Sequence, residues 1–149
     1  MTTLDSAQTA AQAPALATVR ELVGTYQAFA SYSEAFVRQY DLTPAQFDVI
    51  ATLGNTQGLT MGEIGEKTLI TKSTLTGVVD RLETKALVSR EVPPQNRRCV
   101  VVKLTPAGAT LFEQAFPAHV ADIGRHLAAL DTSEIELLRV LLARLRQVF

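Results

Sequence analysis

Seven polar and basic side chains in the middle of the chain have the chemistry needed to bind a nucleic acid. Five of them lie on one side of a stretch that we predict to be helical: Lys72, Ser73, Thr74, Thr76 and Arg81. Hydroxyl groups can hydrogen-bond to base edges, and lysine and arginine can contact phosphates. The other two, Arg97 and Arg98, are adjacent in an expected loop, where a cation can enter a narrow, electronegative minor groove.

A helix-turn-helix pattern positions the first five residues. Thr60 is followed three residues later by Glu63, which predicts a capping box at the start of a short helix. We expect a turn at Leu69-Ile70 and a second helix capped by Thr71. The apolar residues of this second helix are spaced by three and four, so they share the face opposite the polar side chains. They are Leu75, Val78, Val79 and Leu82.

Two short strands should follow the second helix. Residues 88–92 and 99–104 are rich in β-branched side chains, which favours β-structure. Pro93 and Pro94 lie between them, and two prolines cannot continue a central strand. We therefore predict a two-stranded hairpin whose exposed loop carries Arg97 and Arg98.

The charges of the chain are unevenly distributed. Residues 67–103 contain eight lysines or arginines and three acidic residues, whereas the remainder contains six basic and twelve acidic residues. The net charge of the whole chain is only −1 at pH 7, so the overall value conceals a basic segment. Such a segment is typical of a nucleic-acid-binding surface, although a solvated helix with scattered charges is the alternative.

Three segments of the sequence resemble the MarR family of bacterial transcription regulators. They are LTPAQFDVIATL (42–53), LTMGEIGEKTLITKSTLTGVVDRLETKALVSRE (59–91) and NRRCVVVKLTPAG (96–108), and the flanking helices extend the resemblance to about residues 20–148. The resemblance implies a mainly α-helical fold with a small β-hairpin wing: a winged helix-turn-helix with N- and C-terminal dimerisation helices. It also implies that the second helix and the wing contact double-stranded DNA.

Two positions depart from the usual pattern of the family. Its wing commonly reads Asp-x-Arg, and Asn96 stands here in place of the aspartate, so we expect Arg98 to be braced less firmly. The family usually has glycine where this chain has Ala86. A left-handed alanine costs about 1 kcal/mol relative to glycine, so we expect the second helix to end in a different way.

Long apolar helices flank the central region and predict a homodimer. Apolar residues between positions 14 and 39, and again between 135 and 149, recur at intervals of three and four, as in a helical seam. The residues that we assign to the dimer interface are Leu16, Val19, Leu138, Leu142, Leu145 and Phe149. A helical hairpin within one chain is the alternative. Two-fold symmetry would place two second helices about one DNA turn apart, which fits a palindromic operator.

These elements predict three regions. Residues 1–13 are small and polar and should form a disordered tail, residues 14–40 and 106–149 a helical dimerisation region, and residues 41–105 the winged helix-turn-helix lobe.

The family resemblance also implies a repressor that a small ligand releases. Relatives often bind aromatic or phenolic anions between their dimerisation helices and their DNA-binding lobe. Aromatic residues of this chain lie on the elements that should meet there, with one arginine nearby. The residues that we assign to such a pocket are Phe36, Arg38, Tyr40, Phe47 and Phe112.

Other classes of function fit the sequence less well. We find no glycine-rich phosphate loop and no nucleophile elbow, so we predict no enzyme, no catalytic residue and no cofactor. His119 and His126 share a helix face, but no Cys/His/Glu cluster joins them, so we predict no metal site. Cys99 leaves a redox-responsive regulator as one alternative. A winged-helix protein-interaction module without specific DNA binding is another, but it would not explain the double-arginine loop.

The sequence also predicts a location in the cell. No run of eighteen apolar residues predicts a membrane span, and residues 1–14 lack the basic and apolar regions of a secretion signal. With a single cysteine, no disulfide framework within one chain is possible. We therefore expect a cytoplasmic protein that has no contact with a membrane.

Overall fold

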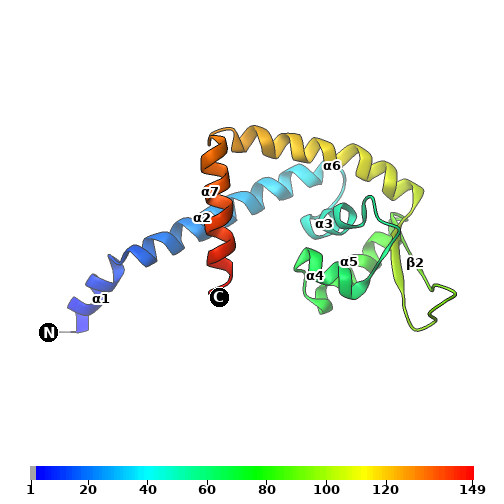
Figure 1. Ribbon diagram of the computed structural model, residues 1–149, viewed down its shortest axis with the longest axis horizontal. Coiled ribbons are helices and arrows are strands. Elements are labelled where there is room, and N and C mark those ends of the chain that lie inside the picture. The colour runs from blue at the N-terminus through cyan, green and yellow to red at the C-terminus, as the bar shows by residue number, and fades with distance from the viewer. Residues whose placement is uncertain (1–2) are drawn as a thin grey trace. The chain divides into compact units, whose positions relative to one another are not determined.

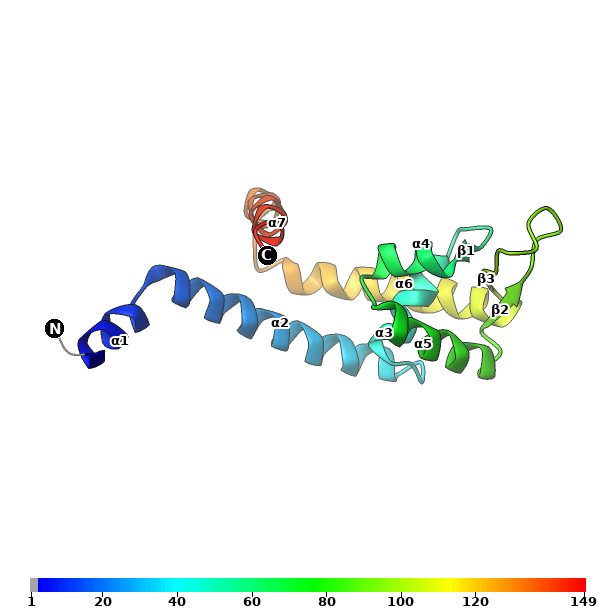
Figure 2. The same ribbon diagram turned by 90° about the horizontal axis from the view of Figure 1, so that it is seen from below.

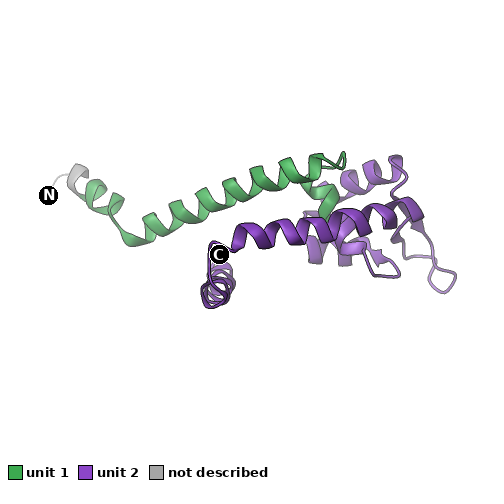
Figure 3. Cartoon of the chain, turned by 90° about the horizontal axis from the view of Figure 1, so that it is seen from above, with its two compact units in different colours: residues 1–48 green, residues 49–149 purple. Residues whose placement is uncertain are grey.

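The computed structural model describes residues 3–149, which divide into two compact units, residues 1–48 and 49–149 (Figure 3). In chain order the elements are α1 (Thr3–Ala11), α2 (Pro14–Arg38), α3 (Pro44–Leu53), β1 (Leu59–Thr60), α4 (Met61–Thr68), α5 (Lys72–Thr84), β2 (Val88–Glu91), β3 (Val101–Leu104), α6 (Pro106–Leu127) and α7 (Thr132–Arg146) (Figure 1). This mainly helical fold with a small antiparallel sheet confirms the predicted fold class. None of the described helices is both long and apolar enough to cross a membrane.

The N-terminal unit differs from the expectation at its start. Residues 1–13 were expected to be disordered, but the chain is helical over Thr3–Ala11, while residues 1–2 lie outside the described part. Alanine is the strongest helix former, and Ala7, Ala10 and Ala11 supply this propensity without a buried face, since residues 6–11 are exposed. Our expectation weighed the polar composition of this segment and neglected its alanines.

Capping explains where the helices of this unit begin. α2 starts with Pro14, which suits a first helical turn because its missing N–H would have no partner there. Before α3, the Thr43 hydroxyl accepts a hydrogen bond from the Gln46 amide at 3.2 Å, and the Gln46 side chain accepts one from the Thr43 amide at 3.1 Å. The structure therefore confirms the predicted capping box at residues 43–46.

The C-terminal unit contains the buried core that holds the helix-turn-helix. The inner side of α5 is buried, as its spacing predicts, and it packs on α4 and β2. Ile50 and Leu53 of α3 and Ile64 of α4 are also fully buried. Burying side chains of this size contributes about 1.5–3 kcal/mol each. The core thus fixes which face of α5 is left for solvent or a partner.

The sheet has three strands and not the two that the sequence predicts. Its order is β1-β3-β2, with Leu59 opposite Val102 and Arg90 opposite Val102 on the other side. β1 was missed because a two-residue strand has no periodicity of its own. Gly58 lets the chain enter it: its φ is +111°, and an added Cβ would lie 2.5 Å from Val101 Cγ1. β3 also begins at Val101, so Cys99 lies in the loop and not in the strand as predicted.

The turn between α5 and β2 corrects our expectation for Ala86. This alanine is left-handed, with φ +59°, so the helix ends in the way that glycine would favour. The Ala86 N–H donates to the Glu83 carbonyl at 2.9 Å, and the Leu87 N–H donates to the Leu82 carbonyl at 3.0 Å. These two bonds form a Schellman motif, which satisfies carbonyls that would otherwise lack partners. The chain keeps the motif and bears the strain of the alanine.

A second set of contacts joins this turn to α6 and explains the sequence L-T-x-x-G. The Thr105 hydroxyl caps α6 by accepting from the Gly108 amide at 3.1 Å, and it donates to the Ala86 carbonyl at 2.6 Å. A Cβ at residue 108 would lie 2.0 Å from the Leu87 carbonyl oxygen. Only glycine therefore allows α6 to approach the turn this closely.

Candidate nucleic-acid interface

The polar side chains predicted to bind DNA all lie on the exposed side of α5. Its inner side is buried, whereas the side chains on the outer side are exposed, and these are Lys72, Ser73, Thr74, Thr76 and Arg81. The preceding turn is held by Leu69, whose backbone is left-handed with φ +60° and whose N–H donates to the Gly65 carbonyl at 3.0 Å. The structure therefore presents these five residues together on one surface.

The N-terminus of α5 is not capped as the sequence predicts. The Thr71 hydroxyl makes no hydrogen bond to the backbone of the first turn. It lies 3.0 Å from the Thr74 hydroxyl and 3.4 Å from the Ser73 hydroxyl. The first turn of a helix has N–H groups without intrahelical partners, and here they remain available beside three hydroxyls. This arrangement suits an anion such as a phosphate group.

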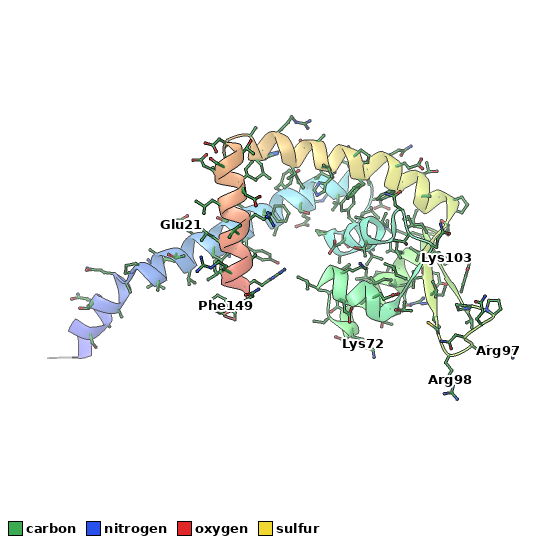
Figure 4. The ribbon with its side chains drawn as sticks, in the orientation of Figure 1. Glu21, Lys72, Arg97, Arg98, Lys103 and Phe149 are labelled. Atoms are coloured by element: carbon green, nitrogen blue, oxygen red, sulfur yellow. The ribbon has the colours of Figure 1, made fainter. Side chains whose placement is uncertain are left out.

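The loop between β2 and β3 carries the two arginines away from the helices (Figure 2). Arg97 and Arg98 are exposed, and both side chains project from the loop (Figure 4). Asn96 shapes the loop through its backbone neighbours: its side-chain oxygen accepts from the Arg98 N–H at 3.2 Å, and its carbonyl oxygen accepts from the Cys99 N–H at 3.1 Å. Asn96 therefore holds the backbone, and within residues 3–149 no acidic side chain pairs with the Arg98 guanidinium.

Arg90 connects the wing to α5, and our sequence analysis did not assign it a role. Its guanidinium bonds to Asp80 at 2.6 Å and also pairs with Glu83. Partial burial disfavours the charged guanidinium, but the hydrogen bonds from the two carboxylates outweigh this and raise the pKa of Arg90. The available signal was the spacing of two acids three residues apart, on one side of a helix, followed by an arginine in the next strand.

Ion pairs inside the basic segment decide which cations remain available. The three acidic residues between positions 67 and 103 are Asp80, Glu83 and Glu91. Arg90 pairs with the first two, and Lys103 pairs with Glu91 at 2.6 Å. Among the described residues, no acidic partner is found for the cations on the predicted DNA-binding surface, which are Lys72, Arg81, Arg97 and Arg98.

The residues predicted to form a ligand pocket are divided between the two units. In the N-terminal unit, the rings of Phe36 and Tyr40 lie 5.9 Å apart, Arg38 pairs with Glu34 at 2.9 Å, and Phe47 is buried. In the C-terminal unit, Phe112 is buried and stacks on Phe116, with 5.1 Å between ring centroids. Their grouping around one pocket stays a prediction.

The residues predicted to form a dimer interface are mostly exposed in the single chain. No residue of α7 is buried; Leu138, Leu142 and Phe149 are exposed and Leu145 is half-buried. On α2, Val19 is exposed and Leu16 is half-buried. Large apolar side chains exposed in this way mark an interaction surface, but the interface itself stays a prediction.

The remaining candidates form no cluster of metal ligands. The structure places no group of three or more His, Cys, Asp or Glu side chains where they could hold a metal ion, within the part of the chain that it describes. His119 is buried in α6, and burial lowers the pKa of its imidazole, while nearby Asp122 acts in the opposite direction. Cys99 is half-buried beside the wing loop.

Comparisons with known proteins agree with this geometry. Residues 40–98 match the profile of the MarR family. The HTH-type transcriptional regulator YkoM of Bacillus subtilis is 30% identical over 121 residues, which cover 79% of each chain. Among solved structures, BpsR of Bordetella bronchiseptica is 26% identical with a TM-score of 0.76 and covers 87% of this chain and 98% of its own. The structure of the S. aureus MepR–DNA complex has a TM-score of 0.78 at 21% identity and covers 87% of this chain and 95% of its own.

The fold, the exposed side of α5 and the arginine-bearing wing thus coincide with the likeness to these regulators. The matched profile contains α4, α5 and most of the wing, and the similarity to YkoM extends across most of the chain. From these observations we conclude that the chain belongs to the MarR family of DNA-binding transcriptional regulators.

Proposed function

We propose that the protein is a homodimeric, sequence-specific repressor that binds a palindromic double-stranded operator in the cytoplasm and is released by a small aromatic or phenolic ligand. The observation that carries the proposal is the pairing of charges in the basic segment. Arg90 and Lys103 engage all three of its acids, so the remaining cations on α5 and the wing are available to phosphates.

The two parts of this surface would read DNA in different ways. α5 enters the major groove, where Ser73, Thr74 and Thr76 hydrogen-bond to base edges or nearby phosphates, and Lys72 and Arg81 contact the backbone. Arg97 and Arg98 enter the minor groove, where a narrow width strengthens the negative potential. The crystal structure of MepR is a complex with DNA, which supports this use of the fold.

Dimerisation is supported by the apolar surface of α7. Five of its large apolar residues are at least 40% exposed in the single chain: Leu137, Leu138, Val140, Leu141 and Leu142. A monomer would leave this surface in water at a cost of about 25 cal/mol per Å². Packing against a second copy removes the cost and supplies the two-fold symmetry that a palindromic operator requires.

Release by a ligand is supported by the aromatic residues and by a relative. Phe36, Tyr40, Phe47 and Phe112 are half-buried or buried, as expected for the wall of a pocket for a ring. DNA binding of BpsR is regulated by 6-hydroxynicotinic acid, a hydroxylated aromatic acid. A ligand bound by these residues would change the spacing of the two α5 helices and lower the affinity for the operator.

The experiment that tests the proposal is binding of the purified protein to the DNA upstream of its own gene, titrated with salt. We expect a steep decrease of affinity with salt, because cations on α5 and the wing displace counterions. We also expect binding at least about 10³-fold tighter than to random DNA of equal length. Equal affinity for both DNAs would contradict the specific regulator and favour a winged-helix protein-interaction module.

A further inference from the structure

A groove crosses the exposed face of the winged lobe next to the predicted DNA-binding residues. It has a volume of about 650 Å³, which falls within the range of small-molecule sites. One wall is α4, the floor is the turn into α5, and the opposite wall is the chain that leads from the wing loop into β3. All lining residues lie within the C-terminal unit.

The lining combines an apolar surface with two cations. The apolar side chains are Met61, Ile70, Leu75 and Val100. The cations are Lys72 at the start of α5 and Arg98 at the end of the wing loop, and for neither is an acidic partner found in the described chain. Glu66 is the single acid of the lining, so the groove has a net positive charge. Apolar walls with a few placed charges are typical of a site for a small organic ligand.

Two glycines on α4 make one wall of the groove smooth. Gly62 and Gly65 both line it and are three residues apart, so they share one face of the helix. A Cβ at residue 62 would have the Thr60 hydroxyl as its nearest neighbour outside its own helix backbone, at 4.0 Å. A flat ring can therefore lie against the bare backbone here, which side chains would prevent.

We propose that this groove binds small aromatic carboxylates, and that the bound anion excludes DNA directly. The ring would pack between the two glycines and Val100, and the carboxylate would pair with Arg98 and Lys72. Because these two cations also belong to the predicted DNA-binding surface, they cannot serve the ligand and a DNA phosphate at once. This inference rests on the proposed DNA-binding function, but it differs from the aromatic pocket in needing no change in the spacing of the subunits.

Selective ¹⁵N-glycine labelling of the full chain provides the test. The protein has eight glycines, so each amide signal can be assigned with single Gly→Ala variants. 1-Naphthoate should shift the signals of Gly62 and Gly65. Gly54 reports on the aromatic pocket instead, because a Cβ at that residue would lie 2.2 Å from the Phe112 ring. Shifts at Gly54 without shifts at Gly62 and Gly65 would overturn the proposal.

Two variants and one salt test the chemistry of the groove. Gly62→Leu should fill the groove and abolish the shift of Gly65, whereas Gly77→Leu is the matched control, because Gly77 does not line the groove and has no atom within 4 Å of an added Cβ. Arg98→Gln should weaken 1-naphthoate binding about tenfold, as expected for a lost charge-assisted contact. Inorganic phosphate at equal ionic strength should not reproduce the shifts. Retained binding in Gly62→Leu, or equal shifts with phosphate, would contradict an aromatic site.

Competition with DNA separates this inference from the proposed function. If the protein binds its operator, 1-naphthoate should weaken binding to a single half-site as strongly as binding to the whole palindrome, and Gly62→Leu should remove this effect. An effect restricted to the palindrome would indicate a change of subunit spacing and overturn direct exclusion. Absence of DNA binding would contradict the proposed function, whereas the glycine signals would still decide whether the ligand occupies the groove.

Discussion

Arg90 of β2 donates a hydrogen bond to Asp80 of α5, with 2.6 Å between Nη2 and Oδ1. The same guanidinium also pairs with Glu83, one turn further along the helix. This bidentate contact joins the base of the wing to the helix that presents the polar surface. It also occupies two of the three acids in the basic segment, so one arginine both positions the wing and unmasks the neighbouring cations.

We predict that Arg90→Ala weakens DNA binding more than it destabilises the protein. Arg90 keeps 27% of its side-chain surface and its partners are more exposed, so the lost pairs should cost about 1 kcal/mol of unfolding free energy. DNA affinity should fall further, because Asp80 and Glu83 become unpaired charges close to phosphates. Urea unfolding and fluorescence anisotropy with labelled operator measure the two effects. Equal DNA affinity of Arg90→Ala and the wild type would contradict the role assigned to Arg90.

Ala86→Gly should stabilise the protein by up to about 1 kcal/mol, because glycine adopts a positive φ without the penalty borne by alanine. Ala86 has φ +59° and its N–H bond to Glu83 would remain. The midpoint of urea unfolding gives the change. Ala121→Gly is the matched control within helical α6, where glycine should destabilise by roughly 0.5–1 kcal/mol. Destabilisation by both substitutions would show that the turn does not need a left-handed residue.

Arg98→Ala should weaken operator binding without dissociating the dimer. A lost phosphate or minor-groove contact should reduce the slope of log affinity against log salt by about 1. Anisotropy titrations at several salt concentrations measure the slope, and sedimentation measures the oligomeric state. Gln95→Ala is a control in the same exposed loop without a change of charge. An unchanged affinity for Arg98→Ala would remove the wing from the interface.

Leu138→Asp should convert the dimer into monomers. Leu138 is 41% exposed in the single chain, so the aspartate costs the monomer little, whereas a buried charge at an interface would be severely destabilising. Sedimentation equilibrium over a range of protein concentrations measures the effect. Arg139→Ala, on the next position of α7, should leave the dimer intact because its side chain pairs with Glu136. A folded Leu138→Asp dimer would place the interface elsewhere.

The protein should lose stability as the pH falls below about 6.5, the usual pKa of histidine. Burial lowers the pKa of His119 in the folded state, and Asp122 opposes this only partly. A group with a depressed folded pKa contributes stability that is fully present above its unfolded pKa and is lost as the pH falls through the folded value. Thermal unfolding of the wild type and of His119→Gln between pH 5 and 7.5 measures this contribution. His126→Gln is the control, since His126 is exposed, and an identical pH dependence in His119→Gln would exclude His119 as the cause.

Local chemistry determined much of this protein from its sequence alone. Capping pairs such as Thr60 and Glu63 act within four residues, and the structure confirms them. The same holds for the buried side of α5, because an apolar spacing of three and four has only one helical interpretation. The polar surface of α5 followed from these features. The likeness to the MarR family was also visible in short segments of sequence.

Tertiary contacts decided the features that sequence reasoning missed or misjudged. β1 exists only because residues 59–60 pair with β3, and a two-residue strand has no pattern that a sequence could show. Ala86 is left-handed because the Thr105 hydroxyl and the hydrogen bonds of the Schellman motif hold the turn in place, although its own preference is helical. The bonds of Arg90 to Asp80 and Glu83 depend on how β2 approaches α5. Each of these contacts joins residues whose proximity is created by folding, and local propensity carries no information about it.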